Sequence, residues 1–181
     1  MRKIKIKVRR IKGNQEIKII DKGDWIDLSV ASDVTLKGPV AETLHRKKGE
    51  DDIVNKFRSV TFSEVVNIPL GVAMQLPKGY EAIIVPRSST YKKYGIICVN
   101  SLGVIDYTYS GNDDEWKFPA LAMRDTKIEE GTRICQFKIQ LSQKATMWQK
   151  INWLLTSKIE IEYVDHLSNV NRGGFGITGI N

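Results

Sequence analysis

Residues 100–111 of the chain read NSLGVIDYTYSG and place an aspartate and an aromatic ring three residues apart in an otherwise apolar stretch. The run before Asp106 predicts a hairpin strand that delivers this carboxylate to a turn, with Tyr109 just after it. A carboxylate held at a turn can orient and deprotonate a water molecule, and a neighbouring ring can pack against a sugar or a base. We therefore expect the functional site in this stretch.

Short strands dominate the remaining pattern. Apolar or alternating runs separated by Gly, Pro, Asn and Asp predict strands at residues 16–20, 81–86, 95–99, 117–123, 133–141 and 158–164. The N-terminal KIKIKV alternates lysines with apolar residues, which is typical of a half-buried edge strand. Helical spacing predicts one short helix near residues 144–155, in which we expect Trp148 and Trp153 to be packing anchors or an interface.

Length, charge and cysteine content narrow the class of protein. A chain of 181 residues fits one domain with a single core. Its net charge of +7 could suit nucleic acid, but the basic N-terminal strand lacks interleaved aromatic residues, so we expect no nucleic-acid partner. Cys98 and Cys135 lie in apolar runs, and we identify neither a signal peptide nor a membrane-spanning run. We expect a cytoplasmic protein without a membrane contact.

Two charged regions are interpreted as surface. Residues 32–68 predict a loop-rich insertion, with the run HRKKGEDD from His45 to Asp52 as an exposed loop. The acidic residues within 112–115 could recruit a metal ion, but a solvated turn is the favoured interpretation.

Three further segments carry groups that suit phosphate. PRSST at residues 86–90 ends a strand with a guanidinium and hydroxyls, and GTRICQF at 131–137 follows a glycine turn with Arg133 and Gln136. NRGGFGITGIN at 171–181 combines an arginine with glycines whose backbone amides can approach an anion. Alone this last segment reads as a disordered tail, but together the segments favour a nucleotide polyphosphate as ligand.

Taken in order, five stretches resemble the five motifs of the trimeric dUTPase family, which hydrolyses dUTP to dUMP and pyrophosphate: GDWIDL at 23–28, PRSST, NSLGVIDYTYSG, GTRICQ and RGGFGITG. The resemblance covers nearly the whole chain. Within the family, the sequence is similar to the branch found in Firmicutes and their phages. It implies an all-β fold, a distorted jelly-roll-like β-barrel over residues 1–170. A flexible glycine-rich arm at 171–181 would close over the active site.

The resemblance also implies roles for individual residues. Asp106 would activate the water that attacks the α-phosphorus, with Gln136 in the catalytic set, and Asp27 would reach Mg²⁺ through water. The triphosphate itself would hold most of the Mg²⁺ coordination. The backbone of Asn100, Gly103, Val104 and Ile105 would pair with uracil, Tyr109 would pack under deoxyribose and Phe175 over the base. The phosphate and arm contacts would come from Arg87, Ser88, Ser89, Arg172, Gly174 and Thr178.

The resemblance implies a homotrimer whose sites are shared, with the fifth motif supplied by a neighbouring subunit. Other functions stay open on sequence alone. A dCTP deaminase of the same fold is disfavoured because residues 117–123, KFPALAM, lack the glutamate that its chemistry needs. A nucleotide sensor without turnover and a regulatory binding protein that uses residues 45–52 and the helix are the remaining alternatives.

Overall fold

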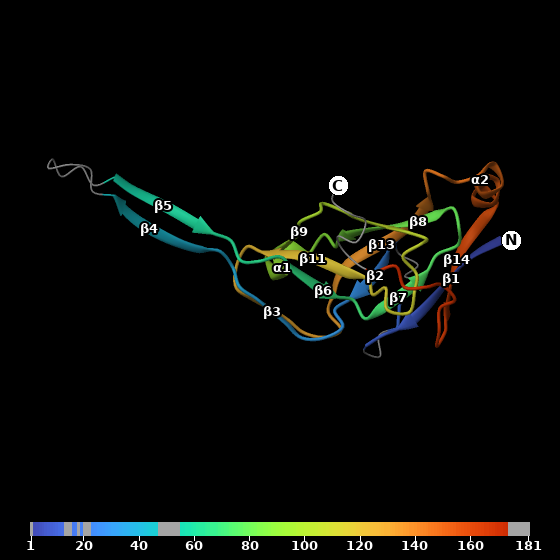
Figure 1. Ribbon diagram of the computed structural model, residues 1–181, viewed down its shortest axis with the longest axis horizontal. Coiled ribbons are helices and arrows are strands. Elements are labelled where there is room, and N and C mark those ends of the chain that lie inside the picture. Colours follow the sequence, from blue (N-terminus) through green and yellow to red (C-terminus); the bar gives the residue numbers. More distant parts are fainter. Residues whose placement is uncertain (1, 13–15, 18, 20–22, 47–54, 174–181) are drawn as a thin grey trace.

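The computed structural model describes residues 2–12, 16–17, 19, 23–46 and 55–173 (Figure 1). The described chain is mostly β, which confirms the predicted fold class. Its strands are β1 (Arg2–Arg10), β2 (Ile26–Ser29), β3 (Val34–Leu36), β4 (Val40–Arg46), β5 (Asn55–Thr61), β6 (Val66–Pro69), β7 (Val72–Gln75), β8 (Tyr80–Pro86), β9 (Ile96–Cys98), β10 (Gly103–Asp106), β11 (Lys117–Ala122), β12 (Thr126–Ile128), β13 (Arg133–Leu141) and β14 (Thr156–Tyr163). The helices are α1 (Thr90–Tyr94) and α2 (Met147–Leu154).

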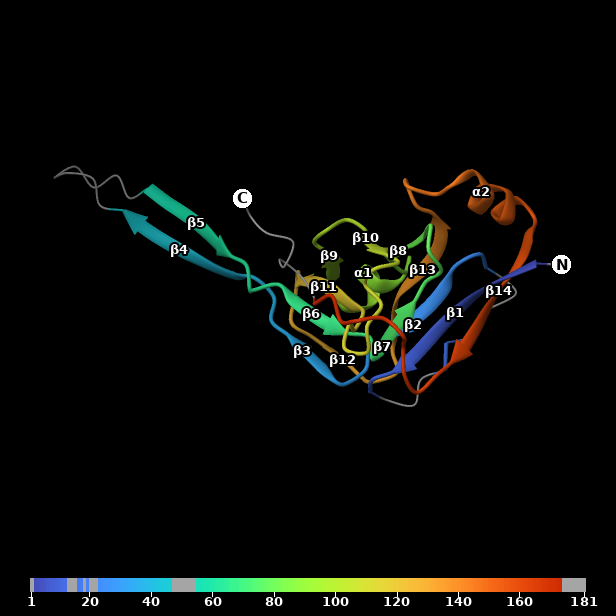
Figure 2. The same cartoon turned by 45° about the vertical axis from the view of Figure 1, so that its right-hand side comes forward.

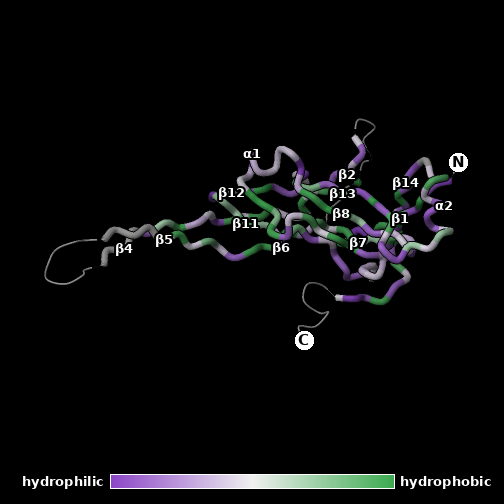
Figure 3. Tube along the Cα trace, turned by 90° about the horizontal axis from the view of Figure 1, so that it is seen from above, coloured by the Kyte–Doolittle hydropathy of each residue, from purple (hydrophilic) through white to green (hydrophobic). Residues whose placement is uncertain are grey.

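The strands form three sheets around one core, seen from two sides in Figures 1 and 2. The sheet orders are β14-β1-β7, β10-β8-β13-β2 and β6-β11-β9, and two further pairs are β12-β3 and β4-β5. None of these sheets closes into a barrel within the described residues, so the architecture is a distorted one. Trp116 and Phe137 meet edge to face in the core with ring centroids 5.3 Å apart, and Figure 3 shows the hydrophobic stretches gathered in the body.

Strand β1 is central in its sheet, so the prediction of an edge strand is wrong. Ile4, Ile6 and Val8 are buried and the lysines between them are exposed, as the alternation predicts. However, β1 pairs with β14 in parallel and with β7 in antiparallel orientation. Both partners lie far along the sequence, and a local pattern reports which face is buried but not which edges are paired.

The other predicted strands have mixed outcomes. The five from residue 81 onward correspond to β8, β9, β11, β13 and β14 and are confirmed. The one at 16–20 is not: the described residues 16, 17 and 19 are not in a strand, and Ile17 is buried as part of the core instead.

Residues 32–68 hold four strands, β3 to β6, where the sequence predicts a loop-rich insertion. β4 and β5 form an antiparallel ribbon from Val40↔Thr61 onward that projects away from the body (Figures 1 and 2). Val40 and Val60, near its base, are 60% and 51% exposed. At this base the neighbouring residues of β4, Val40 and Ala41, are both exposed, so no buried side imposes a period-two pattern there. This explains why the sequence pattern did not predict the strand. Residues 47–54 lie outside the described range.

The predicted helix is confirmed as α2, while α1 was not predicted. The Thr146 hydroxyl caps α2 by accepting from the backbone N–H of Gln149, and the Gln149 side chain accepts from the backbone N–H of Thr146. Trp153 packs against Tyr80 with ring centroids 5.9 Å apart. Trp148 is 77% exposed and is not part of the hydrophobic core formed by the described residues. Among the described helices, none is long and apolar enough to cross a membrane.

Candidate active site

The predicted hairpin around residue 100 consists of two strands that belong to different sheets. β9 pairs with β11 and β10 pairs with β8, and the turn between them contains Ser101 with a φ of 59°. β10 is the outer strand of its sheet within the described residues. An outer strand presents backbone N–H and C=O groups that no neighbouring strand uses. The segment Gly103–Ile105 therefore offers a free hydrogen-bonding edge.

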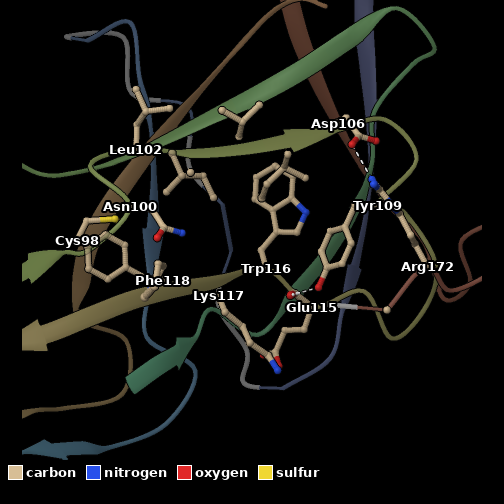
Figure 4. A pocket seen from close by; sticks show the side chains of 16 residues that line it. Cys98, Asn100, Leu102, Asp106, Tyr109, Glu115, Trp116, Lys117, Phe118 and Arg172 are labelled. Atoms are coloured by element: carbon tan, nitrogen blue, oxygen red, sulfur yellow. Dashed lines mark hydrogen bonds and ion pairs between the residues drawn. The ribbon is translucent and has the colours of Figure 1, made fainter. Parts of the chain in front are cut away.

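A cavity of about 300 Å³ lies between these two sheets (Figure 4). The edge of β10 lines one side of it, and Phe118 and Pro119 of β11 line the other. The structure brings seven of the predicted site residues together in its lining: Asn100, Gly103, Val104, Ile105, Asp106, Tyr109 and Arg172. An apolar cavity with a polar backbone edge suits a flat heterocycle that needs directional hydrogen bonds.

Asp106 ends β10 and is tied down on both oxygens. Its Oδ1 accepts from the backbone N–H of Thr108 at 2.8 Å and from the Thr108 hydroxyl, and its Oδ2 accepts from Arg172 at 2.6 Å. Burial alone would raise the pKa of Asp106, but the hydrogen bonds from Thr108 and Arg172 outweigh it and lower that pKa. The group is a carboxylate at neutral pH. The resemblance assigns Arg172 to a neighbour's site, whereas here it contacts Asp106 of its own chain.

Tyr109 and Trp116 are aromatic residues with polar atoms that line the cavity (Figure 4). The Tyr109 hydroxyl donates to the backbone oxygen of Glu115 at 2.9 Å, which fixes the ring beside Asp106. Burial, with smaller contributions from Asp114 and Glu115, raises the pKa of Tyr109. Within the described residues the buried indole N–H of Trp116 has no hydrogen-bond partner. Sequence reasoning missed Trp116, since a tryptophan beside a strand reads as ordinary core.

A second cluster gathers charged groups on β2, β13 and the segment after β8. Asp27 accepts from Arg87 Nε at 2.9 Å on one oxygen and from Arg133 Nη1 at 2.9 Å on the other, and its side chain is 9% exposed. The strand register places Gln136 opposite Asp27. Arg133 was not among the predicted contacts, although it lies in a stretch that the sequence singles out.

Two of the remaining predicted contact residues, Ser88 and Ser89, lie within the described part of the chain. Ser89 precedes α1, next to the half-buried Arg87, and Ser88 is exposed beside it. Gly174, Phe175 and Thr178 lie outside the described residues.

The two clusters stand at opposite corners of one sheet. Asp106 faces Glu81 on β8, whereas Gln136, the neighbour of Asp27, faces Val85 four residues further along. With strand spacings of about 4.8 Å and a rise of about 3.3 Å per residue, the Cα atoms of Asp106 and Asp27 lie roughly 19 Å apart. No side chain spans that distance.

Comparison with known proteins identifies the family. The dUTPase family model matches residues 52–177. The SPbeta prophage-derived deoxyuridine 5′-triphosphate nucleotidohydrolase YosS of Bacillus subtilis is 43% identical over 97% of this chain and 99% of its own length. The deoxyuridine 5′-triphosphate nucleotidohydrolase of Hydrogenobaculum is 37% identical over 65% of this chain and 72% of its own.

Solved structures agree on the fold. The dUTPase of Streptococcus mutans superposes with a TM-score of 0.53 at 20% identity, covering 71% of this chain and 86% of that one. The dUTPase of Staphylococcus bacteriophage 80alpha with dUPNHPP gives 0.54 at 16% identity, covering 97% and 98%. For another structure of that phage enzyme, the description says that phage dUTPases control transfer of virulence genes. The family match and the Bacillus relative together confirm the resemblance seen in the motifs: the chain belongs to the dUTPase family.

Proposed function

We propose that this chain hydrolyses dUTP to dUMP and pyrophosphate at the cavity beside β10. The observation that carries the proposal is the position of Asp106, an ionised carboxylate at the end of a free strand edge that lines a base-sized cavity. The relatives in the family are named for this reaction. Removal of dUTP would keep uracil out of DNA and supply dUMP.

Base recognition follows from the edge of β10. Backbone groups of Gly103 to Ile105 would pair with the polar edge of uracil. A fixed donor and acceptor order rejects cytosine, because its exocyclic amine is a donor where uracil has an acceptor oxygen and its N3 is an acceptor where uracil has a donor. Tyr109, held by Glu115, would pack against deoxyribose. The unpartnered indole N–H of Trp116 offers one more donor to a ligand in the cavity.

The proposed chemistry uses Asp106 to hold a water in line with the α-phosphorus. The water oxygen bonds to phosphorus, the bond from phosphorus to the bridging oxygen breaks, and pyrophosphate leaves with that electron pair. The water proton passes to Asp106 and then to solvent. A carboxylate with a lowered pKa is a weak base, so most of the acceleration would come from positioning and charge stabilisation.

The separation of the clusters supports a homotrimer with shared sites. A water on Asp106 must lie within a few ångströms of the α-phosphorus, and the groups that bind the other phosphates must lie close by. Arg87, Arg133 and Gln136 of the same chain are too far away, since they sit at the opposite corner of the sheet. A second subunit would bring its Asp27 cluster, with Ser88 and Ser89, to the phosphates. The remaining arm residues, Gly174, Phe175 and Thr178, would close over the nucleotide.

The residues present fit a Mg²⁺ ion that arrives with the triphosphate. The described chain holds no group of three or more His, Cys, Asp or Glu that could bind a metal. Both oxygens of Asp27 are occupied by arginines, which suits contact with a hydrated ion through water rather than direct ligation. The ion would neutralise phosphate charge. Both cysteines are free thiols, which supports a reducing cytoplasmic setting.

The test is pyrophosphate release from dUTP, dCTP, dTTP and UTP with Mg²⁺, for the wild type and Asp106→Asn. We expect turnover of dUTP alone, reduced about 10²–10⁴-fold by the substitution. Asp33→Asn is the matched control, because Asp33 is another exposed carboxylate that accepts a backbone N–H, from Glu130 at 2.9 Å, away from the cavity. Ammonia release from dCTP would instead establish a deaminase, and binding of dUTP without turnover would establish a sensor.

A regulatory binding role is the second candidate, favoured by the projecting β4-β5 ribbon and by the exposed side chains of α2. Met147, Trp148 and Leu154 are 70%, 77% and 82% exposed. Deleting residues 43–57 should abolish retention of a protein partner in pull-downs while dUTP turnover persists. Retention of every partner by the deleted chain would refute the role of the ribbon.

A further inference from the structure

Glu115 is a half-buried residue of the cavity lining whose carboxylate the proposed reaction leaves unused. The sequence favours a solvated turn over residues 112–115, but this prediction is wrong for Glu115 and for Asp114, which is 1% exposed. Oε1 of Glu115 accepts from the backbone N–H of Gly71 at 2.9 Å, and the backbone oxygen of Glu115 accepts from the Tyr109 hydroxyl at 2.9 Å (Figure 4). This residue thus connects the turn between β6 and β7 to an aromatic ring of the cavity.

The turn that holds the Glu115 carboxylate is itself fixed by the body of the protein. Gly71 has a φ of 69°, and a Cβ added there would lie 2.5 Å from the backbone oxygen of Lys12 and 2.8 Å from the Ala31 Cβ. The Gly71 oxygen accepts from the backbone N–H of Ile11 at 2.8 Å. Because protein interiors are close-packed, Gly71 cannot shift without displacing the segments that follow β1 and β2. The Glu115 carboxylate is therefore bonded to a rigid support.

The backbone that follows Glu115 is bonded to the same two strands. The N–H of Trp116 donates to the oxygen of Val72 at 2.8 Å, and the oxygen of Trp116 accepts from the N–H of Leu70 at 3.0 Å. The N–H of Trp116 and the C=O of Glu115 belong to one planar trans peptide and point in opposite directions. The bond to Val72 therefore directs the Glu115 oxygen away from β7 and toward Tyr109.

The sugar of a bound nucleotide would lie at Tyr109 in the proposed complex. The base would pair with Gly103–Ile105 and the α-phosphorus would lie at Asp106, so the sugar that joins them would lie between these groups, where Tyr109 lines the cavity (Figure 4). The Tyr109 backbone N–H donates to the Asp106 oxygen at 3.1 Å, and its hydroxyl donates to Glu115. A ring held at both ends cannot swing aside for an additional hydroxyl on the sugar.

We infer that Glu115 is a positioning residue for sugar selection: bonded to Gly71 and Tyr109, it fixes the ring against which the sugar packs, so that deoxyribose is accepted and the 2′-hydroxyl of ribose is excluded. The inference rests on the proposed function. Glu115 acts on the sugar only through Tyr109, so its loss should change the selection between sugars and not merely the strength of nucleotide binding.

The first test measures the dissociation constants of dUMP and UMP by titration calorimetry. Glu115→Ala leaves the Gly71 N–H without its acceptor and loosens the ring, so we expect the ratio Kd(UMP)/Kd(dUMP) to fall about 2- to 10-fold. Glu115→Gln keeps an acceptor oxygen and should retain the wild-type ratio. Glu42→Ala is the control, because Glu42 is exposed on the projecting ribbon and lies outside the cavity lining. A general loss of structure would weaken both nucleotides alike and leave the ratio unchanged.

The second test asks whether Glu115 acts through Tyr109. Tyr109→Phe keeps the ring but removes the hydroxyl that reaches Glu115, so the ratio should fall as it does in Glu115→Ala. The double variant should show the ratio of Tyr109→Phe alone, because the contact that Glu115 supports is already gone. Additive losses of the ratio would overturn the inference. A wild-type ratio in a folded Glu115→Ala would also overturn it, and so would equal binding of dUMP and UMP by the wild type.

Glu115→Asp provides a second variant if Glu115→Ala does not fold. It keeps the charge but is one methylene shorter, so its carboxylate no longer reaches the Gly71 N–H in the same geometry, and the ratio should again fall. The binding assay needs no turnover. Absence of dUTP hydrolysis in the wild type would therefore reject the proposed function, whereas dUTP hydrolysis with a wild-type ratio in both Glu115→Ala and Glu115→Asp would reject the positioning role of Glu115.

Discussion

Asp106 owes its charge at neutral pH to two neighbours. Burial opposes the carboxylate, yet hydrogen bonds from Thr108 and Arg172 keep the pKa of Asp106 below its ordinary value. Because the folded-state pKa is lowered, these contacts stabilise the fold above the ordinary carboxylate pKa of about 3.9. That stabilisation is lost as the pH falls through the lowered folded-state value. The same contacts set the acidic limit of activity.

Thr108→Val should move that limit. The substitution removes the hydroxyl that donates to Asp106 Oδ1 and leaves the backbone N–H of residue 108 in place. With one donor fewer, the pKa of Asp106 rises, and the acidic limb of the kcat/KM profile should shift to higher pH. A profile of kcat/KM against pH reports this group in the free enzyme. Thr108→Ser keeps a donor and should retain the wild-type limb; a limb unmoved by valine would contradict the assignment.

For single residues, prediction from sequence succeeded where the site residues are close neighbours along the chain. Asp106 and Tyr109 lie in one short stretch, and the structure places both in the cavity lining. Arg133 was predicted to suit phosphate, but its pairing with Asp27 was not predicted, and neither was the contact of Asp114 with the backbone of Arg172, because these partners lie far apart along the chain. Local composition suggests a surface turn for an acidic run, whereas the folded chain buries Asp114 against the backbone N–H groups of Gly111, Arg172 and Gly173.

Among the elements, β10 matters most because one of its edges pairs with no other strand of the described chain. The stretch around residue 100 suggests a closed hairpin, in which that edge would be paired and unable to read a base. In the structure β9 belongs to a different sheet from β10, and the cavity lies between these two sheets. The positions of β1, β8, β9, β11, β13 and β14 were predictable from sequence patterns, but strand pairing was not, which is also why β1 was misjudged as an edge.

Helix α2 should tolerate loss of its cap without loss of catalysis. Thr146→Ala removes the capping hydroxyl and should cost about 1 kcal/mol of helix stability. None of the residues of α2 lines the cavity, so kcat/KM for dUTP should not change. Hydrogen exchange over residues 147–155 would show faster exchange of the helical amides.

Thr146→Ser is the control for α2, since it keeps the capping oxygen and should retain wild-type exchange. A fall in kcat/KM in Thr146→Ala would show that α2 communicates with the cavity, contrary to its place at the far end of the body (Figure 2). Unchanged exchange would show that packing of Trp153 on Tyr80 holds the helix without its cap.

For the whole molecule, the distance between the Asp106 cluster and the Asp27 cluster is the observation that bears on subunit assembly. The described chain carries a base-sized cavity with Asp106 at one corner of a sheet and a cationic cluster around Asp27 at the other. The motifs predicted both clusters from sequence. Their separation of roughly 19 Å follows only from strand order and register, which no single motif contains. Under the proposed function, we therefore expect a complete dUTPase site to combine corners from different subunits.

Mixing two inactive variants tests this shared-site assembly. Asp106→Asn and Asp27→Asn alone should each reduce dUTP turnover by about 10²-fold or more. If the two aspartates of a site come from different subunits, trimers refolded from an equal mixture contain some sites with both carboxylates intact. Random assembly then predicts about a quarter of the wild-type rate.

The control for this mixture replaces Asp27→Asn by the double variant Asp27→Asn/Asp106→Asn. No site in the control mixture has an intact Asp106, so refolding and subunit exchange alone cannot create activity. Pyrophosphate release in the first mixture and none in the second would place Asp106 and Asp27 of one site on different chains. No activity in either mixture, with trimers formed, would require both aspartates of one chain to act on the same nucleotide, which the strand register of β8, β13 and β2 opposes.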